Sequence, residues 1–180
     1  MKKVIIIGTT GSGKTTLASQ IANTLKIKHI QLDQLFWKPH WGESTDDEFF
    51  EKIKKEIENG NWVIDGNYKR TNHLTWHQAD TVIWIDLPKW LTLYQNFTRS
   101  LIRALKKENL WGHEGINESF RRMFSKDSVT LWMFKTYDSN RIEYFKRMQN
   151  PEYQNINFIH LKSRKEIRNF VSNLSHSQYN

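Results

Sequence analysis

The chain has 180 residues, of which 38% are hydrophobic and 13% aromatic, so it can bury a substantial core and is not expected to be disordered. It contains no cysteine, which excludes disulfide frameworks, thiolate catalysis and cysteine-ligated zinc, and predicts a reducing, cytoplasmic location. The formal net charge of +8 suits a partner that carries phosphate, either a nucleic acid or a nucleotide. Because the cations are spread along the chain in short clusters, the nucleotide is favoured.

The N-terminal half alternates apolar strands with amphipathic helices. A β-branched run over residues 3–7 ends at Gly8 and predicts a buried parallel strand. The next predicted elements are a helix over 14–25, a strand over 29–32, a helix over 45–58 capped within 44–47, and a strand over 62–64. No apolar stretch is long enough to cross a bilayer, so no membrane partner is expected.

The C-terminal half continues the alternation. Its predicted elements are a strand over 81–87, a helix over 89–107, a mobile loop over 108–118 that contains two glycines, a helical region over about 118–148, a strand over 157–161, and a helix over 163–174. This order predicts an α/β fold with a parallel sheet covered by helices on both faces. The length suits one domain over 1–180, with room for a small inserted lid.

Residues 8–15, Gly-Thr-Thr-Gly-Ser-Gly-Lys-Thr, match the phosphate-loop pattern G-x-x-x-x-G-K-[ST] at every fixed position. The glycines allow a tight turn that brings backbone N–H groups to phosphate oxygens, and the following helix adds its positive end. Lys14 supplies a cation for the β- and γ-phosphates, and the Thr15 hydroxyl is a ligand for Mg²⁺. The predicted nucleotide-binding residues are Gly8, Thr10, Gly11, Ser12, Gly13, Lys14, Thr15 and Thr16.

Three acids lie at the predicted carboxyl ends of strands, where α/β sheets bind ligands. Asp33 follows the second strand and could accept a proton from an attacking hydroxyl, or serve as a helix cap or turn residue. Asp65 ends an apolar strand, which is the position of the carboxylate that contacts Mg²⁺ through water in P-loop proteins. An aspartate in an ordinary turn after a strand would give the same sequence pattern. Asp86 is expected to be structural.

Arginines and tryptophans complete the set of candidates. Arg99 and Arg103 share one face of the predicted helix over 89–107, and Arg141 follows the predicted loop. Guanidinium groups could stabilise the negative charge of a transferring phosphoryl group. The alternative is that these arginines simply lie on a solvent-exposed helix face, which would show the same spacing. Trp37, in the loop after Asp33, is a candidate wall for a substrate.

The phosphate loop, together with the segments Leu32–Trp37, Trp62–Tyr68 and Ile83–Pro88, resembles the bacterial DNA topology modulation protein (FlaR-like) group, a branch of the adenylate kinase and shikimate kinase-like P-loop NTPase superfamily. The resemblance implies a five-stranded parallel sheet in the order 2-3-1-4-5, a small helical lid at about 99–145 that carries arginines, and phosphoryl transfer from ATP. It also implies that Asp33 lies near the accepting hydroxyl, and that Arg70 is a loose match to the substrate-contacting arginine of adenylate kinases.

The sequence therefore predicts an ATP- and Mg²⁺-dependent phosphotransferase, with GTP as the other candidate donor, that acts on a nucleotide or a small hydroxylated metabolite. The expected catalytic residues are Lys14, Asp33, Arg103 and Arg141; the substrate-binding residues Asp33, Trp37 and Arg70; the metal-binding residues Thr15 and Asp65. The alternatives are a nucleotide-gated DNA-binding or topology-modulating protein, and a regulatory ATPase that needs no acceptor.

Overall fold

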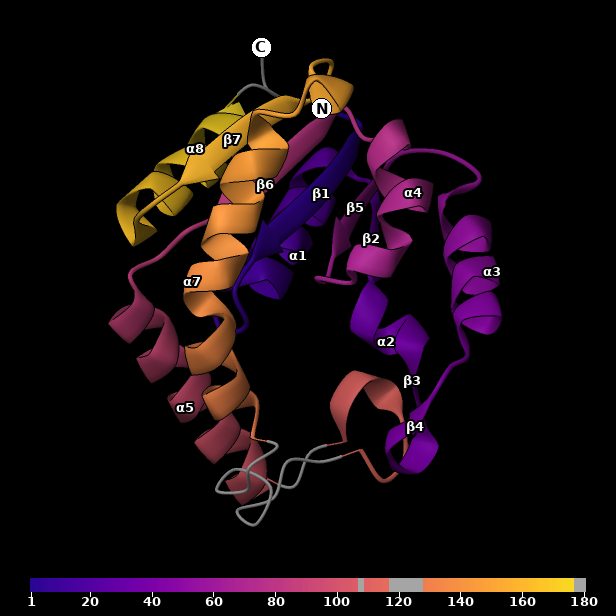
Figure 1. Ribbon diagram of the computed structural model, residues 1–180, viewed down its shortest axis with the longest axis vertical. Coiled ribbons are helices and arrows are strands. Elements are labelled where there is room, and N and C mark those ends of the chain that lie inside the picture. Colours follow the sequence, from indigo (N-terminus) through magenta and orange to yellow (C-terminus); the bar gives the residue numbers. More distant parts are fainter. Residues whose placement is uncertain (107–108, 117–127, 177–180) are drawn as a thin grey trace.

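The computed structural model of the chain describes residues 1–106, 109–116 and 128–176 (Figure 1). Its centre is a five-stranded sheet made of β1 (Lys3–Gly8), β2 (Lys28–Gln31), β5 (Trp62–Asp65), β6 (Thr81–Ile85) and β7 (Asn157–Leu161). Neighbouring strands are all parallel, in the order β2-β5-β1-β6-β7. The labels differ from the expected 2-3-1-4-5 because a short hairpin, β3 and β4, is inserted before β5. Counted within the sheet alone, the order is 2-3-1-4-5.

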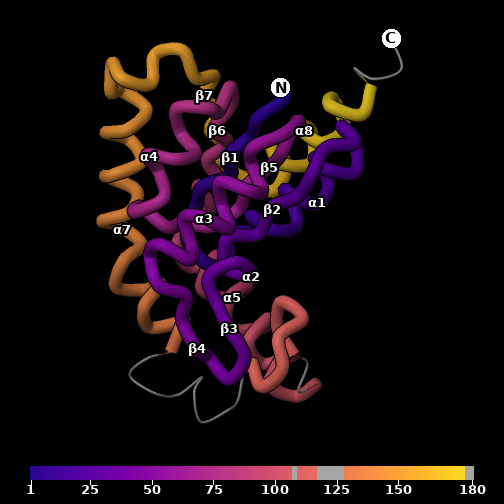
Figure 2. The backbone as a smooth tube through the Cα atoms, turned by 90° about the vertical axis from the view of Figure 1, so that its right-hand side faces the viewer, coloured from indigo at the N-terminus to yellow at the C-terminus, as the bar shows by residue number. Residues whose placement is uncertain are grey.

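The residues of β1 alternate between two hydrophobic layers, as a strand buried on both faces requires. Val4 and Ile6 pack with α1 (Lys14–Leu25) and α8 (Arg164–His176), whereas Ile5 and Ile7 belong to the layer under α3 (Asp46–Ile57), α4 (Asn72–Thr75) and α7 (Val129–Met148). Figure 2 shows α7 on one side of the sheet and α1 and α8 on the other. The predicted α/β class is confirmed.

After β2 the chain forms a helical turn and a hairpin where a loop was expected. Leu32 and Phe36 are four residues apart and both buried, so they anchor the turn α2 (Leu32–Phe36), in which Asp33 is half-buried. Trp37 then lies in β3 (Trp37–Lys38), which pairs antiparallel with β4 (Gly42–Glu43) across the turn η1 (Pro39–Trp41). The cap expected within 44–47 is confirmed, because Thr45 forms a capping box with Glu48 at the start of α3.

The described part of the segment expected to be a mobile loop, residues 109–116, is docked against this hairpin (Figure 1). The backbone N–H of His40 donates to the carbonyl of Glu114 at 3.0 Å, and Leu110 and Ile116 are buried. The apolar side chains around η4 (Leu110–Gly112) thus hold the glycine-containing turn in place. Residue 107 of the expected helix, residues 108, 117 and 118 of the expected loop, and the first ten residues of the helical region expected over 118–148 lie outside the described residues.

Beyond the carboxyl end of β6, α5 (Lys89–Lys106) packs antiparallel to α7. Asn96 Nδ2 donates to Thr130 Oγ1 at 3.1 Å, and Lys89 Nζ lies 2.8 Å from Asp138 Oδ2. Short turns complete the described chain: η2 (Lys69–Thr71), η3 (Trp76–Gln78) and η5 (Pro151–Tyr153). Within the part of the chain that the structure describes, no helix combines the length and the apolar character needed to cross a bilayer.

Candidate functional site

The phosphate loop connects β1 to α1 and has a backbone that only glycine accommodates easily. Gly11 and Gly13 adopt φ angles of 81° and 97°, in the left-handed region. A Cβ on Gly11 would lie 2.7 Å from Cβ of Asn96, so α5 packs directly against the loop. Gly13 caps α1 without a side-chain hydrogen bond, and the first turn of α1 holds no acidic residue. The N–H groups of that turn are therefore suited to an anion.

Lys14 folds back over the loop. Its ammonium group donates to the carbonyls of Gly8 and Thr9 at 2.8 and 3.1 Å. Burial lowers the pKa of Lys14 to about 8, an effect that Asp65 and Asp33 oppose. The negative charge of a bound polyphosphate would stabilise the protonated form of Lys14 and raise its pKa again, so the geometry fits the role expected for Lys14.

The remaining predicted phosphate-binding residues lie in the loop or in the first turn of α1. Thr10 is half-buried, Ser12 is buried, and the N–H of Ser12 donates to the Thr9 carbonyl at 3.1 Å. Thr15 and Thr16 are exposed in the first turn of α1. The hydroxyl of Thr15 is thus accessible beside Lys14, where an ion bound to the phosphates would need a ligand.

Asp65 and Asp33 are brought to the same edge of the sheet. Asp65 is buried at the end of β5, opposite Ile6 of β1, and its Oδ2 lies 3.2 Å from Nε2 of His29. Burial raises the pKa of Asp33, while a hydrogen bond from Tyr68 and the charge of Lys14 lower it. Both carboxylates act electrostatically on Lys14, so these three predicted residues form one charged group.

A magnesium ion fits this set of donors. Mg²⁺ commonly takes one or two protein oxygens and completes its shell with phosphates and water. Across 1–106, 109–116 and 128–176, no cluster of three His, Cys, Asp or Glu side chains forms a metal cage made of protein alone. The Thr15 hydroxyl and the Asp65 carboxylate are the residues that would hold the ion together with a nucleotide.

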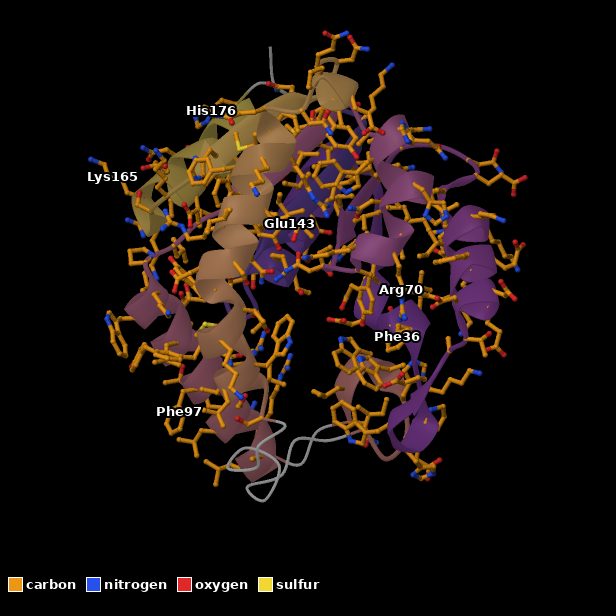
Figure 3. All side chains as sticks on the ribbon, in the orientation of Figure 1. Phe36, Arg70, Phe97, Glu143, Lys165 and His176 are labelled. Carbon is orange, nitrogen blue, oxygen red and sulfur yellow. The ribbon has the colours of Figure 1, made fainter. Side chains whose placement is uncertain are left out.

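The sequence pattern assigns no separate role to Tyr68, yet this residue contacts Asp33 directly. Its hydroxyl donates to Asp33 Oδ1 at 2.7 Å. Arg70 lies 5.7 Å from the centroid of the Tyr68 ring and 4.7 Å from that of Phe36, and it pairs with Asp46 at 3.0 Å. Figure 3 shows Arg70 beside Phe36. The Tyr68 ring thus lies between Arg70 and Asp33 and contacts both.

Trp37 belongs to an aromatic cluster with Trp41 and Trp111. The ring of Trp37 is nearly parallel to that of Trp111, with an angle of 9° between planes and 6.4 Å between centroids. Trp41 meets both rings edge-on. Because Trp37 also contacts Phe36 of α2, the cluster borders the element that carries Asp33. Its use as a substrate wall stays a prediction.

The arginines divide into two groups. Arg99 lies close enough to Lys14 and Asp33 to lower the pKa of both, and it donates to Asn96 at 2.7 Å. Arg103, one turn further along α5, is half-buried on the same side of the helix. Of the three candidate arginines, Arg99 is thus the one that lies near Lys14 and Asp33.

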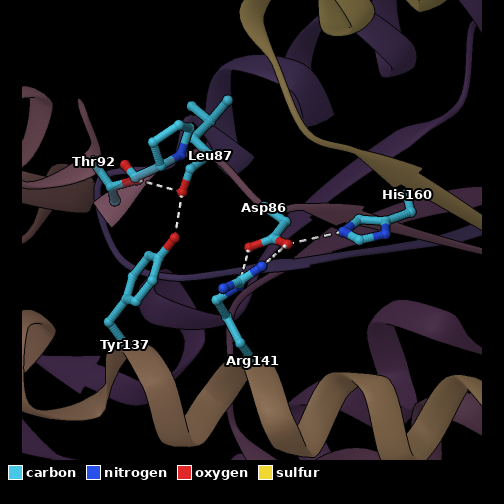
Figure 4. Close-up of polar contacts among 7 residues, drawn as sticks. Asp86, Leu87, Thr92, Tyr137, Arg141 and His160 are labelled. Carbon is cyan, nitrogen blue, oxygen red and sulfur yellow. Dashed lines mark hydrogen bonds and ion pairs between the residues drawn. The ribbon is translucent and has the colours of Figure 1, made fainter. Parts of the chain in front are cut away.

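Arg141, which was expected to contact phosphate, is held by Asp86 (Figure 4). Its Nε and a terminal nitrogen donate to the two oxygens of Asp86 at 2.7 and 3.0 Å, and His160 Nε2 lies 3.0 Å from the same carboxylate. In the same region Tyr137 donates to the carbonyl of Leu87 at 2.7 Å. Asp86 therefore fastens α7 to the ends of β6 and β7, as its expected structural role requires.

A cavity of about 270 Å³ opens beside the phosphate loop. Ile7, Gly66 and Asn67 form its floor, and Asn67 donates to the carbonyl of Gly8. Its polar walls carry Lys69 and Arg147, which share the carboxylate of Glu143, and its other lining residues are Asn72, Trp76, Trp132, Asn140 and Tyr144. The cavity thus joins amides, aromatic rings and two cations to the start of the loop.

A second cavity, of about 470 Å³, lies along the free edge of β2 between α3 and the segment over 109–116. Neither lining includes a residue of the phosphate loop itself, but the smaller cavity is lined by Ile7, directly before the loop, and by Asn67, which donates to the carbonyl of Gly8. The larger cavity touches the candidate site only through His29, the partner of Asp65. The smaller cavity is thus the one that lies next to the start of the phosphate loop.

Comparisons with known proteins bear on the fold. The NB-ARC domain family matches residues 1–75, the part that contains the phosphate loop, Asp33 and Asp65. No curated protein sequence matches the chain. Among solved structures, a shikimate kinase from Acinetobacter baumannii in complex with shikimate is similar with a TM-score of 0.60 and 11% identity, over 99% of this chain and 93% of that one. A gluconokinase from Sinorhizobium meliloti 1021 gives a TM-score of 0.50 and 13% identity, over 99% and 95%.

These likenesses establish the fold. The chain has the α/β P-loop architecture that the two kinases share. The matches do not confirm the narrower resemblance to DNA topology modulation proteins.

Proposed function

We propose that the protein transfers the γ-phosphoryl group of ATP to a hydroxyl of a small anionic metabolite. The observation that carries the proposal is the grouping of Lys14, Asp33 and Asp65 at the strand ends. A cavity lined by Gly66 and Asn67, the two residues after Asp65, lies next to this group. The similarity to solved kinases supports the proposal, because phosphoryl transfer is chemistry for which this architecture is used.

Each residue would have a separate task. Lys14 and the loop N–H groups would hold the β- and γ-phosphates, while Thr15 and Asp65 would hold Mg²⁺, which neutralises phosphate charge. Asp33 would accept the proton of the acceptor hydroxyl as its oxygen bonds to the γ-phosphorus and the bond to ADP breaks. A carboxylate with a raised pKa is a stronger base than an ordinary one, and Tyr68 holds it in position.

Arginines would stabilise the charge of the transferring group. Arg99 already acts on Lys14 and Asp33, and Arg103 extends from the same side of α5. Arg141 is bound through two donors by the carboxylate of Asp86, so it would contribute from α7 only if this ion pair opened. The lid proposed at about 99–145 would bring these groups together and exclude water.

The cavity favours a small metabolite over a nucleotide as acceptor. Its volume of about 270 Å³ is below the range of roughly 300–1,000 Å³ that is usual for drug-sized ligands. Lys69 and Arg147 carry two positive charges against one from Glu143, so the lining has an excess of positive charge. Its three asparagines suit hydroxyl groups, and the acceptor is thus expected to carry both hydroxyls and an anionic group.

The test is a screen for acceptor-dependent ADP formation with ATP or GTP and Mg²⁺. Sugar acids, other hydroxylated carboxylates, sugar phosphates and nucleoside monophosphates would be compared, with Asp33→Asn as the inactive partner of the native chain. Turnover with a small hydroxylated anion and its loss in Asp33→Asn are expected. ADP release at the same rate without any acceptor would instead indicate a regulatory ATPase. Salt-dependent DNA binding without turnover would favour the DNA-binding alternative.

A further inference from the structure

Helix α5 is amphipathic in the reverse sense of an ordinary surface helix. Its buried residues are Thr92, Asn96, Ser100 and Ala104, which recur every four positions and are polar or small. This side faces the phosphate loop and α7, as the contact of Gly11 with Asn96 and the hydrogen bond from Asn96 to Thr130 show. The apolar side of α5 is left in solvent, whereas a surface helix normally buries it.

The exposed apolar side chains of α5 join those of α7. The α5–α7 face consists of Trp90, Tyr94, Phe97 and Leu105 on α5 and Leu131 and Phe134 on α7. The rings of Trp90 and Phe134 lie 6.3 Å apart, so the two stripes are continuous. Figure 3 shows Phe97 on the outer side of α5.

Over the described ranges, most of the exposed large hydrophobic side chains lie on these two helices. Among the residues that the structure describes, Met1 is the single large hydrophobic side chain that is exposed elsewhere than on α5 or α7. Trp90 is 70% exposed and Tyr94 64%. Contiguous apolar patches of this kind mark interaction surfaces on soluble proteins.

The size of the face matches one side of a stable dimer. Burying an aromatic side chain completely removes roughly 150–250 Å² from water. The four aromatic residues of the face are 39% to 70% exposed. With the aliphatic residues of both helices, the area approaches the roughly 800 Å² that each partner contributes to a standard interface.

The charges on the face decide between a second protein copy and a lipid surface. The Lys89–Asp138 ion pair lies between the two stripes, and the side chain of Asp138 is 70% exposed. A carboxylate is unfavourable against lipid tails and is repelled by anionic headgroups. In a protein interface, by contrast, a neutral pair can accept further hydrogen bonds from the partner.

We propose that the α5–α7 face is the interface of a symmetric homodimer, in which α5 and α7 of one protomer pack on the same helices of a second copy. A two-fold axis brings identical patches together, so one apolar face is enough to form a closed assembly. The helices of both protomers would form a four-helix layer, with the phosphate loops behind it. This proposal is independent of the proposed phosphoryl transfer.

Sedimentation of the full chain over about 1–100 μM tests the proposal, since an interface of this size is expected to hold in that range. The expected native species has twice the chain mass of 21.6 kDa. Tyr94→Glu on α5 and Leu131→Glu on α7 place a charge within the face at positions that are exposed in the protomer, and each is expected to yield monomers. Lys165→Glu, an exposed charge change on α8, is the matched control and should leave the dimer intact.

Three results would overturn the homodimer. The first is a native chain that sediments as a monomer at every concentration. The second is that both face variants still sediment as dimers while circular dichroism shows them folded. The third is a monomer that binds vesicles containing phosphatidylserine through the same face. The use of two variants on different helices keeps the test decisive if one of them does not fold.

Discussion

The Tyr68 hydroxyl donates a 2.7 Å hydrogen bond to Oδ1 of Asp33 and so joins the loop after β5 to helix α2. The two residues are 35 positions apart, yet β2 and β5 are adjacent and parallel, so their carboxyl ends deliver both residues to one place. The bond holds the carboxylate in position and opposes the effect of burial on its pKa.

Removing this bond should raise the pKa of Asp33. In Tyr68→Phe, burial acts without the opposing hydrogen bond, so a higher pH is needed to keep the carboxylate ionised. The acidic limb of kcat/KM is therefore expected to move to higher pH, with a smaller change at alkaline pH. Tyr153→Phe, at the opposite end of the sheet, is the control. An acidic limb that does not move in Tyr68→Phe would exclude Asp33 as the base.

Lys14→Met should abolish nucleotide binding and stabilise the protein without ligand. In the folded chain burial lowers the pKa of Lys14 to about 8 from an ordinary value of 10.5, so folding disfavours its charged form at neutral pH. Methionine removes that cost together with the cation. Urea unfolding and calorimetric titration with ATP and Mg²⁺ measure the two effects. Lys55→Met, at an exposed site on α3, should change neither, and undiminished ATP binding in Lys14→Met would contradict the site.

Nucleotide affinity should fall as pH rises through about 8. Below that pH Lys14 is already protonated in the free protein, and above it the polyphosphate must draw a proton onto the lysine. The dissociation constant is expected to rise by up to about tenfold per pH unit, with proton uptake on binding. Titrations in buffers of different ionisation enthalpy measure the uptake. Equal affinity at pH 7 and at a pH well above 8, with no uptake, would separate Lys14 from the phosphates.

Arg141→Met should destabilise the fold by about 1–3 kcal/mol, because it leaves the buried Asp86 carboxylate with one charged partner fewer. The exposed Lys54–Glu51 pair provides the comparison, since Lys54→Met is expected to change the free energy of unfolding by no more than about 0.5 kcal/mol. Urea denaturation of both variants measures the difference. Equal free energies would show that His160 alone satisfies Asp86.

Local patterns in the sequence were sufficient for the phosphate loop and for most elements. The pattern over residues 8–15 specifies its own backbone, because glycine is needed where φ is positive and a lysine must follow at a set distance. The alternation of apolar strands with amphipathic helices predicted the sheet, and its order followed from the resemblance. The capping box of Thr45 and Glu48 is equally local, so it too could be predicted.

Contacts between distant residues depended on the tertiary structure. The pairing of Tyr68 with Asp33, the capture of Arg141 by Asp86 and the approach of Arg99 to Lys14 result from strand order and helix packing, which no short pattern encodes. The direction of α5 is the clearest case. Its sequence defines one polar and one apolar face, but only the folded chain places the polar face against the phosphate loop. An anion-binding site needs polar neighbours, and meeting that need leaves the apolar face outside.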